Sequence, residues 1–361
     1  MAPTFLRQRE KLPRERFVSY FSGLKTQAYY DPAAARALSY HDPAATEKGE
    51  IIGVRSISWN PLSTLVATGS SDKSIRVWNP EKPNVQHSTQ LKGHTAPVEK
   101  VAFNPVRDAE LCSVSADGVV KFWDVRTKAC VNEVRNLGDT FTLAWAPDGD
   151  SLVVGNREND LHVLSPTQPT PLITKRQPAR TNDLAFCWGG KKLFAASSDG
   201  RTRILSFPDL EPCFRGNFTA ATSATDDDDD DTSAVEFALR GHTAECLTVA
   251  MSPTGRHLAT GGSDAIIALW DTAKWTCQRT ITKMLGPVCS LSFSWDGNYV
   301  VGGSSEGTGL EVTRPESGDH IYTFKTAQPV PVVSWAPTRY FLAYSELGSL
   351  RIVGVDTERR A

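Results

Sequence analysis

The stretch CLTVAMSPTGRHLATGGSDAIIALWD, residues 246–271, decides the fold of this 361-residue chain. Apolar and polar residues alternate in its first part, which is the pattern of a half-buried strand. Two further apolar runs follow, and Pro, Gly, Ser and Asp residues separate the three runs. These residue types favour tight turns. The segment therefore predicts three short strands that fold back on one another.

The same frame recurs along the chain. It returns in six other segments, at residues 54–78, 98–124, 141–164, 182–205, 288–312 and 331–353. One residue near the end of each first strand marks the spacing: Trp59, Phe103, Trp145, Phe186, Met251, Phe293 and Trp335. Five of the six intervals between these markers are 41–44 residues, and the sixth is 65 residues. The regular intervals match the period of WD repeats.

This periodicity predicts the architecture. A small sheet that is apolar on both faces cannot bury them alone, so such units stack radially around an axis. We therefore predict an all-β fold, a seven-bladed WD-repeat β-propeller. The long interval holds an insertion at residues 219–235 with six consecutive Asp at 226–231. Because like charges repel and cannot pack, we expect this insertion to be disordered, between the third and fourth strands of the fourth blade.

Two repeats carry the fullest polar motif, with Gly-His before the first strand, an acid after the second and Trp-Asp in the third. We predict that these side chains form buried hydrogen-bonded clusters within their blades. The candidate structural residues are His94, Asp117 and Trp123 in the second repeat, His242, Asp264 and Trp270 in the fifth, and Asp72 and Trp78 in the first. A His beside an Asp also resembles part of a catalytic triad. The structural interpretation is favoured, because both pairs recur inside repeats with no exposed nucleophile beside them.

The two ends of the chain indicate how the ring closes. The last repeat stops after its third strand, which leaves the seventh blade one strand short. An unpaired sheet edge favours aggregation, so another segment should cover it. We predict that residues 34–40 (AARALSY) supply the missing strand, which gives a propeller over residues 34–356 and a short tail at 357–361.

The first 33 residues differ in composition from the repeats. Six Lys or Arg residues are interleaved with Phe17, Tyr20, Phe21, Tyr29 and Tyr30. Basic and aromatic residues together can bind RNA, because bases stack on aromatic rings. They can equally form an arm that docks on a partner or on the rim of the disc. We favour docking or disorder, and treat residues 1–33 as a partly disordered basic arm outside the ring.

Composition and motifs argue against several other classes of protein. The formal net charge is −2, which gives no overall attraction to nucleic acid or to an anionic membrane. No apolar run is long enough to span a membrane. The seven Cys include no C-x-x-C pair, and the seven His show no metal-ligand spacing. Nucleotide-binding and hydrolase motifs are absent from the sequence. We therefore expect no catalytic site, metal or cofactor.

Several positions that depart from a generic repeat resemble the WD-repeat subunit of the THO complex, the THO complex subunit 3 family. They include Leu152–Asn156 followed by Arg-Glu-Asn-Asp, and ILSFPDLEP at 204–212. ATGGSDAIIALWD at 259–271, PVCSLSFSWDG at 287–297 and SWAPTRYFLAY at 334–344 are similar as well. The likeness spans about residues 50–355, whereas the Asp-rich insertion and the long N-terminal arm depart from the family core.

The resemblance implies a non-catalytic nuclear scaffold in an assembly, THO or TREX, that couples transcription to mRNA packaging and export. It implies elongated helical THO subunits as partners and an indirect link to a DEAD-box RNA helicase and the mRNP. One alternative is the substrate receptor of a cullin-type ubiquitin ligase. Trp123-Asp124-Val125-Arg126 fits the W-D-x-R box of such receptors, in which Arg126 would contact the adaptor. Another propeller adaptor, such as a histone or peptide reader, would need a convergent charged or aromatic pocket at the centre of the disc.

Overall fold

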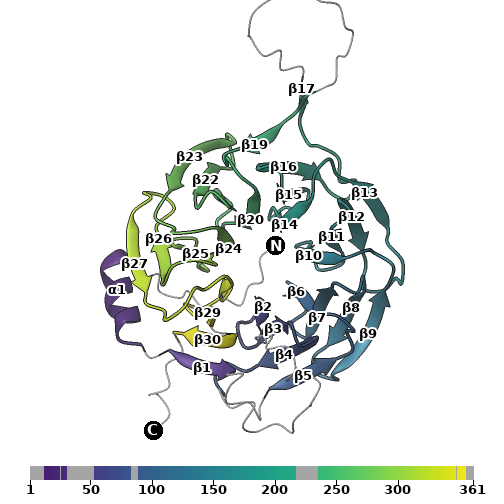
Figure 1. The fold of residues 1–361 in the computed structure, drawn as a ribbon, viewed down its shortest axis with the longest axis horizontal. Coiled ribbons are helices and arrows are strands. Elements are labelled where there is room, and N and C mark those ends of the chain that lie inside the picture. The colour runs from purple at the N-terminus through teal and green to yellow at the C-terminus, as the bar shows by residue number, and fades with distance from the viewer. Residues whose placement is uncertain are drawn as a thin grey trace, which may run out of the picture.

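The computed structural model describes residues 12–24, 26–30, 53–82, 88–216, 235–346 and 348–354. Seven four-stranded antiparallel sheets form a closed ring around a central axis (Figure 1). The first strand of each sheet lies nearest the axis and the fourth lies at the rim. The predicted seven-bladed WD-repeat β-propeller is therefore confirmed.

The first three blades follow the repeats in order. Blade 1 contains β2 (Val54–Trp59), β3 (Val66–Ser70), β4 (Ser74–Trp78) and β5 (Thr89–Lys92). Blade 2 contains β6 (Val98–Phe103), β7 (Glu110–Ser115), β8 (Val120–Asp124) and β9 (Ala129–Val134). Blade 3 contains β10 (Thr140–Trp145), β11 (Leu152–Asn156), β12 (Asp160–Leu164) and β13 (Ile173–Arg176).

Blades 4 to 6 have the same plan, with one added hairpin. Blade 4 contains β14 (Thr181–Phe186), β15 (Lys192–Ser197), β16 (Arg201–Ser206) and β19 (Ala238–Arg240). Blade 5 contains β20 (Cys246–Met251), β21 (His257–Gly262), β22 (Ile267–Asp271) and β23 (Thr276–Ile281). Blade 6 contains β24 (Val288–Phe293), β25 (Val300–Ser304), β26 (Leu310–Thr313) and β27 (His320–Phe324).

The hairpin between β16 and β19 marks the start and end of the insertion. Its strands β17 (Arg215–Gly216) and β18 (Val235–Glu236) pair with each other, separately from the four-stranded sheet of blade 4. The insertion thus joins the third and fourth strands of blade 4, as predicted from the repeat spacing. Residues 217–234, which include the six Asp, lie outside the described residues, as do residues 355–361 at the C-terminus.

Blade 7 is completed by the start of the chain. It contains β28 (Val333–Trp335), β29 (Leu342–Glu346), β30 (Ser349–Val353) and β1 (Gln27–Tyr30). β1 pairs with β30 in antiparallel register, with Gln27 opposite Ile352. Closure by an N-terminal strand is confirmed, but the segment predicted for it is wrong. Residues 27–30 occupy the free edge of β30, and residues 34–40 lie outside the described part of the chain.

The region before β1 contains a helix that packs on the disc, within the segment that was expected to be an arm outside the ring. Helix α1 (Arg14–Ser22) packs against the disc beside β27 (Figure 1). Phe17 and Phe21 are 0% and 2% exposed, because they insert among aromatic side chains of blades 6 and 7. Residues 12–30 therefore belong largely to the propeller rather than to an arm outside it. Of the open interpretations of the arm, docking on the rim of the disc is the one that the structure supports.

The core lies between neighbouring blades rather than within one sheet. One buried cluster, for example, joins Cys112 and Phe122 of blade 2 to Leu143 and Trp145 of blade 3. The middle strands are buried on both faces, and every residue of β3, β11, β25 and β29 is buried. Radial stacking therefore gives each sheet the second apolar surface that it lacks alone.

Candidate functional site

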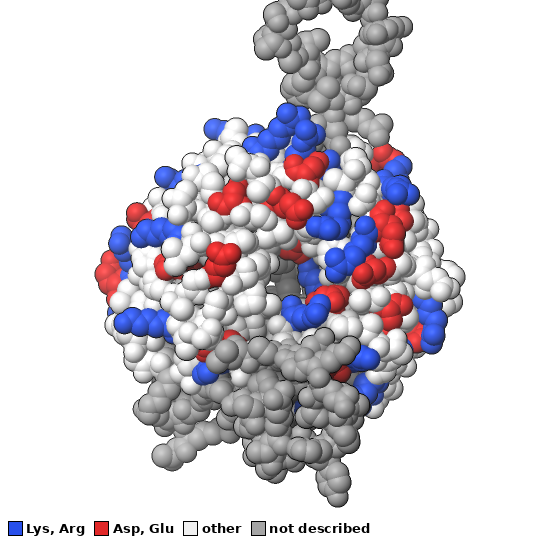
Figure 2. All heavy atoms as spheres, viewed as in Figure 1, with Lys and Arg blue, Asp and Glu red and all other residues white. Residues whose placement is uncertain are grey.

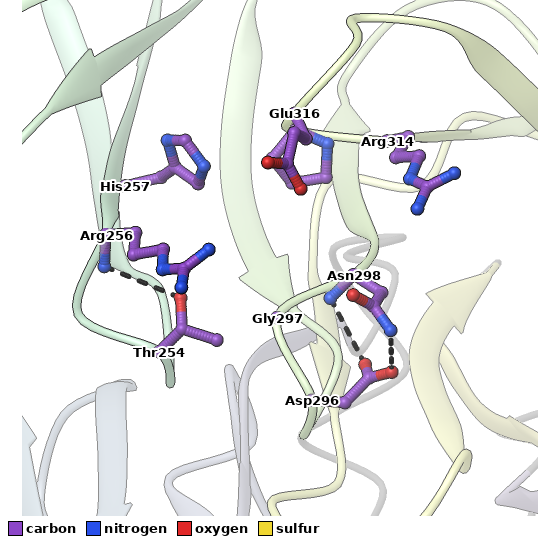
Figure 3. Close-up of a pocket in the computed structure, with 9 residues that line it drawn as sticks. Thr254, Arg256, His257, Asp296, Gly297, Asn298, Arg314 and Glu316 are labelled. Atoms are coloured by element: carbon purple, nitrogen blue, oxygen red, sulfur yellow. Dashed lines mark hydrogen bonds between the residues drawn. The ribbon is translucent and has the colours of Figure 1, made fainter. Parts of the chain in front are cut away.

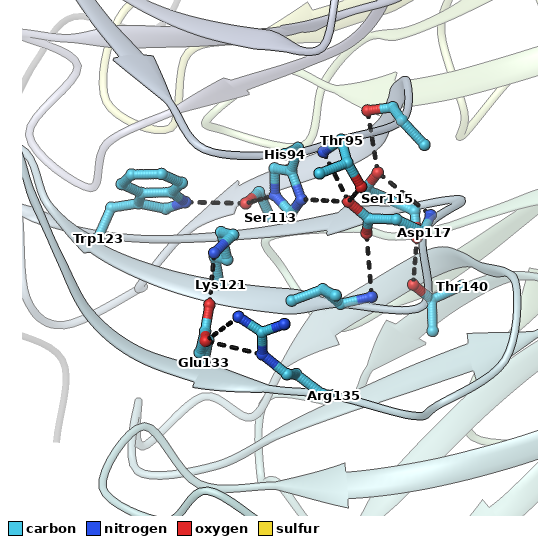
Figure 4. Close-up of polar contacts among 12 residues, drawn as sticks. His94, Thr95, Ser113, Ser115, Asp117, Lys121, Trp123, Glu133, Arg135 and Thr140 are labelled. Atoms are coloured by element: carbon cyan, nitrogen blue, oxygen red, sulfur yellow. Dashed lines mark hydrogen bonds and ion pairs between the residues drawn. The ribbon is translucent and has the colours of Figure 1, made fainter.

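The polar cluster of blade 2 is buried beside Trp123 (Figure 4). His94 Nε2 lies 2.7 Å from Ser113 Oγ, and Trp123 Nε1 donates to the same oxygen at 2.8 Å. On the other side of the ring, His94 Nδ1 lies 3.5 Å from Asp117 Oδ2. Asp117 Oδ2 also accepts from the backbone N of Thr95 at 2.9 Å and from its hydroxyl at 3.0 Å. The cluster thus ties the turn before β6 to β7 and β8.

Burial sets the protonation of this cluster. Desolvation lowers the pKa of His94 more than the nearby Asp117 raises it, which favours the neutral imidazole. Desolvation alone would raise the pKa of Asp117, but hydrogen bonds from Thr95 outweigh it, and the pKa is lowered. Ser, His and Asp here have the connectivity of a catalytic triad. Ser113 is 0% exposed, however, and its hydroxyl is held by Trp123, so no substrate can reach it.

Blade 5 repeats the arrangement with a threonine. His242 Nε2 lies 2.8 Å from Thr260 Oγ1, which accepts a hydrogen bond from Trp270 Nε1 at 3.0 Å. His242 Nδ1 lies 3.1 Å from Asp264 Oδ1, closer than in blade 2. Thr260 is also 0% exposed. The buried hydroxyl in both blades argues for a structural role of these His and Asp residues.

Blade 1 keeps part of the cluster. Trp78 is 1% exposed and donates from Nε1 to Thr68 Oγ1 at 3.2 Å. Asp72 Oδ1 accepts from the backbone N and the hydroxyl of Ser74, at 2.9 and 2.7 Å. The hydroxyl partners of the three Trp residues were not identified from the sequence. Their signal is a Ser or Thr ten residues before the Trp, as in Thr68–Trp78, Ser113–Trp123 and Thr260–Trp270.

Arg126 lies at the end of the third strand of blade 2, on the surface. Its side chain is 71% exposed, and its Nη2 lies 2.8 Å from Asp108 Oδ1. The box Trp123 to Arg126 does not act as one unit, because Trp123 is buried in the blade cluster. A contact between Arg126 and a ligase adaptor stays a prediction.

The central channel is lined by residues that bulges place there. In blades 1 to 6 the register between the first and second strands shifts at the second residue of the first strand. A bulge leaves one residue unpaired and redirects its side chain. All six extra residues line a cavity of about 680 Å³ on the axis: Arg55, Glu99, Phe141, Asn182, Leu247 and Cys289.

The charges in the channel are paired across blades. Arg55 Nη1 lies 2.5 Å from Glu99, and Lys100 forms an ion pair with Asp183. Asp183 Oδ2 also accepts from the backbone N of Val249, at 3.1 Å. Among the lining residues only Phe141 is aromatic. This lining does not form the convergent charged or aromatic pocket that a peptide reader would need.

The outer surface carries both signs of charge. Figure 2 shows acidic and basic residues interspersed over the visible face, with the channel opening at its centre. The part of this face that is described therefore presents no single-sign patch to nucleic acid. Within the described residues, no three His, Cys, Asp or Glu side chains are grouped to hold a metal ion. No helix in that part of the chain has the length and apolar character needed to cross a membrane.

Known proteins share the repeats and, in several cases, most of the chain. The family described as WD domain, G-beta repeat matches residues 45–79, 85–124, 234–271 and 275–308. THO complex subunit 3 of Arabidopsis thaliana is 30% identical over 294 residues, which is 81% of this chain and 86% of that protein.

Two further relatives share less of their length. WD repeat-containing protein AAC3 of Dictyostelium discoideum is 29% identical over 310 residues, 80% of this chain and 61% of that protein. Pre-mRNA-processing factor 19 homolog 2 of Arabidopsis thaliana is 26% identical over 293 residues, 78% of this chain and 49% of that protein. Partial coverage of this kind is what shared repeats alone produce, whereas the match to the first relative covers 86% of its length.

Proposed function

Since this chain belongs to the THO complex subunit 3 family of WD-repeat proteins, we propose that it is a non-catalytic scaffold subunit of a nuclear THO-like complex. The complex would couple transcription to mRNA packaging and export. The observation that carries the proposal is the 30% identity to a THO complex subunit over 86% of that protein's length. The likeness is thus not confined to the generic repeat.

The geometry fits a scaffold. The His and Asp pairs that resemble catalytic groups sit against a buried hydroxyl in each cluster, and both hydroxyl side chains are 0% exposed. The channel holds paired charges. What the disc offers to other molecules is a rigid rim and two sets of loops, which is how propellers present binding surfaces.

The proposed partners are the elongated helical subunits of the complex. They would dock on the rim or loops of this propeller, and a DEAD-box RNA helicase would join the assembly through them rather than through this chain. The chemistry on RNA would then belong to the helicase, and the link of this chain to the mRNP would be indirect.

Affinity purification of the tagged chain from nuclear extract, with nuclease treatment, tests the proposal. Quantitative mass spectrometry should recover large helical THO subunits in amounts close to that of the bait. Nuclease should leave this recovery unchanged, because the contacts are between proteins. A tagged Trp123→Ala variant is the matched control, since loss of a buried blade residue should reduce recovery of every partner together. Recovery of only a ligase adaptor or nucleosomal proteins would contradict the THO assignment and leave the propeller intact.

A further inference from the structure

A recess opens between blades 5 and 6, away from the channel (Figure 3). Its volume is about 280 Å³. Three turns on one side of the disc enclose it: the turns between β20 and β21, between β24 and β25, and between β26 and β27. Arg256 and His257 lie on the blade 5 side, with Glu316 and Arg314 across the opening. No function considered above uses this recess.

The two arginines that line the recess have no side-chain partner within the described part of the chain. Among the described residues, neither the Arg256 nor the Arg314 guanidinium has a hydrogen bond or an ion pair, although both side chains line the recess. His257 Nδ1 is buried without a hydrogen-bond partner in the same part of the chain. Arg279 Nε donates to the carbonyl oxygen of Glu316 at 2.9 Å, which places a third guanidinium beside the turn. Both arginine side chains are exposed, so their guanidinium groups are free to bind an anion, and the unpaired His257 Nδ1 lies buried beside them, where polar atoms are normally paired.

The nearby acids do not neutralise this cluster. Asp296 is 5% exposed, and its carboxylate is already engaged by Ser294, Asn298 and Tyr340. Tyr340 donates to it at 2.6 Å. Glu316 is the one other acid that lines the recess, and it is exposed. Two guanidinium groups and an imidazole therefore face one solvated carboxylate.

We propose that this recess binds a phosphorylated serine or threonine in a flexible segment of a partner protein. Guanidinium groups bind phosphate oxygens through charge-assisted hydrogen bonds, and a phosphate monoester carries close to two negative charges at neutral pH. Arg256, Arg314 and His257 supply the donors from two adjacent blades. Glu316 at the opening disfavours a second acid and favours a Lys or Arg beside the phosphorylated residue. The site depends on the propeller geometry and not on which complex the chain joins.

A phosphoprotein fits the recess better than RNA does. Single-stranded RNA is bound by extended basic grooves with aromatic rings on which bases stack. The recess is small, and His257 is the one ring with stacking capacity among its lining residues. The phosphodiester of RNA also carries a single charge, which uses fewer of the available donors.

The test measures binding to the purified full chain. A fluorescent library of peptides with a fixed central phosphoserine and randomised flanks is compared with its unphosphorylated twin, with a single-stranded RNA and with inorganic phosphate. We expect selective retention of phosphopeptides enriched in Lys or Arg next to the phosphoserine. Enriched single sequences then give the affinity by fluorescence anisotropy.

Substitutions separate this site from non-specific charge. Arg256→Ala and Arg314→Ala should each weaken phosphopeptide binding about tenfold, in line with the loss of a hydrogen bond to a charged group. Glu316→Gln should abolish the preference for Lys or Arg next to the phosphoserine while binding still requires the phosphate, because it removes the carboxylate that would pair with that residue. Arg126→Ala, which removes an exposed arginine of blade 2, is the matched control and should leave binding unchanged. Thermal melts of all four variants should coincide with that of the parent chain.

Two results of the phosphopeptide measurements would overturn the proposal, and one result of the RNA measurement would replace it. One is equal binding of phosphorylated and unphosphorylated libraries, or no enrichment from either. The other is binding to phosphopeptide that survives the Arg256→Ala/Arg314→Ala double variant. RNA binding that exceeds phosphopeptide binding and is lost in that double variant would assign the recess to nucleic acid instead. Because the assay uses the isolated chain, each result is independent of recovery of THO subunits from extract.

Discussion

Blade 2 and blade 7 solve the same packing problem by different means. Blade 2 is one continuous segment, and its cluster joins residues 10 to 22 positions apart, such as Trp123 with Ser113 and Thr95 with Asp117. Blade 7 takes its outer strand from the start of the chain, and Tyr340 Oη accepts a hydrogen bond from the backbone N of Leu12, 328 positions away. One blade is stabilised by local polar contacts, and the other by contacts with a distant segment of the chain.

The acid at the end of the second strand is what the two blades share. Asp117 accepts a hydrogen bond from the backbone of the preceding turn at Thr95, and Glu346 does the same for Ala327, at 2.5 Å. Blade 7 has no Trp-Asp sequence at its third strand. In its place, Phe17 and Phe21 of α1 pack with Tyr299, Trp335 and Tyr340. The comparison indicates that the turn contact is common to these blades, whereas the means of filling the core varies.

The largest expected effect is at the N-terminal helix. The double substitution Phe17→Ala/Phe21→Ala removes two fully buried rings that lie 4.6 Å apart. Single Phe→Ala changes in cores cost about 3–5 kcal/mol, so the pair should cost roughly 5 kcal/mol or more, with incomplete additivity. Chemical denaturation measures this loss in the free energy of unfolding. Val18→Ala/Tyr20→Ala, at side chains 39% exposed, is the control and should cost little. A loss below about 1 kcal/mol in the Phe variant would mean that α1 is not part of the folded core.

Trp123→Ala tests how much the local polar cluster stabilises blade 2. Trp123 is 3% exposed, and we expect a loss of about 3–5 kcal/mol in the free energy of unfolding. Trp188→Ala, at a side chain 60% exposed, is the matched control. Equal melting temperatures for the two variants would show that the polar cluster does not stabilise blade 2.

Ser113→Ala isolates the hydrogen bonds of that cluster. It leaves the buried Trp123 Nε1–H and His94 Nε2 without their shared partner, while the side-chain volume changes little. We expect a loss of about 1–3 kcal/mol. Thr260→Val in blade 5 should cause a similar loss of stability, because the same hydrogen bonds occur there. Unchanged melting temperatures in both variants would mean that packing, and not these hydrogen bonds, stabilises the clusters.

Acid should weaken the local clusters in a defined range. Burial lowers the pKa of His94 below the reference value of 6.5, and it does the same for His162, a buried residue of β12 whose Nδ1 lies 2.9 Å from Thr174 Oγ1. Their contribution is therefore complete above about pH 6.5 and is lost as pH falls through the folded-state pKa, because the unfolded chain takes up protons first. We therefore expect lower stability at pH 5 than at pH 7. His162→Asn should reduce this difference, measured by urea denaturation at both values.

The smallest expected effect is at the insertion. Gly216 and Val235 already pair in the β17–β18 hairpin, so a short Gly-Ser turn in place of residues 217–234 can join them. We expect a change below about 0.5 kcal/mol, because shortening a surface loop alters closure entropy only slightly. A thermal melt shifted by several degrees would show that the insertion supports the disc.

The sequence was most informative where the repeat was complete. The spacing of marker residues such as Trp59 and Phe103 set the number of blades and the place of the insertion, because each blade is a local unit. The hydroxyls of Ser113 and Thr260 were missed, since Ser and Thr in strands carry no signal until the opposing Trp and His are placed. The closing strand was put at residues 34–40 rather than 27–30, because its register depends on an edge more than 300 positions away.

The recess between blades 5 and 6 could not be found from the sequence either. Arg256 and Arg314 belong to different repeats and look like ordinary surface charges in each. Only the radial stacking of the blades brings the turn before β21 and the turn before β27 to one opening. Sites between blades are therefore a property of the ring and not of any repeat.

The long-range attachment of α1 has a consequence for synthesis. A ribosome releases α1 first and the residues that bury it last, since Leu12 and Tyr340 are 328 positions apart. At translation rates of about 5–20 residues per second, Phe17 and Phe21 are synthesised roughly 15 to 65 seconds before the blade 7 residues that they contact. A chain truncated before Trp335 lacks the part of their cover that blade 7 supplies. In such a chain the hydrophobic FVSYF segment stays more exposed, and chaperones and proteases that bind exposed apolar residues can recognise it.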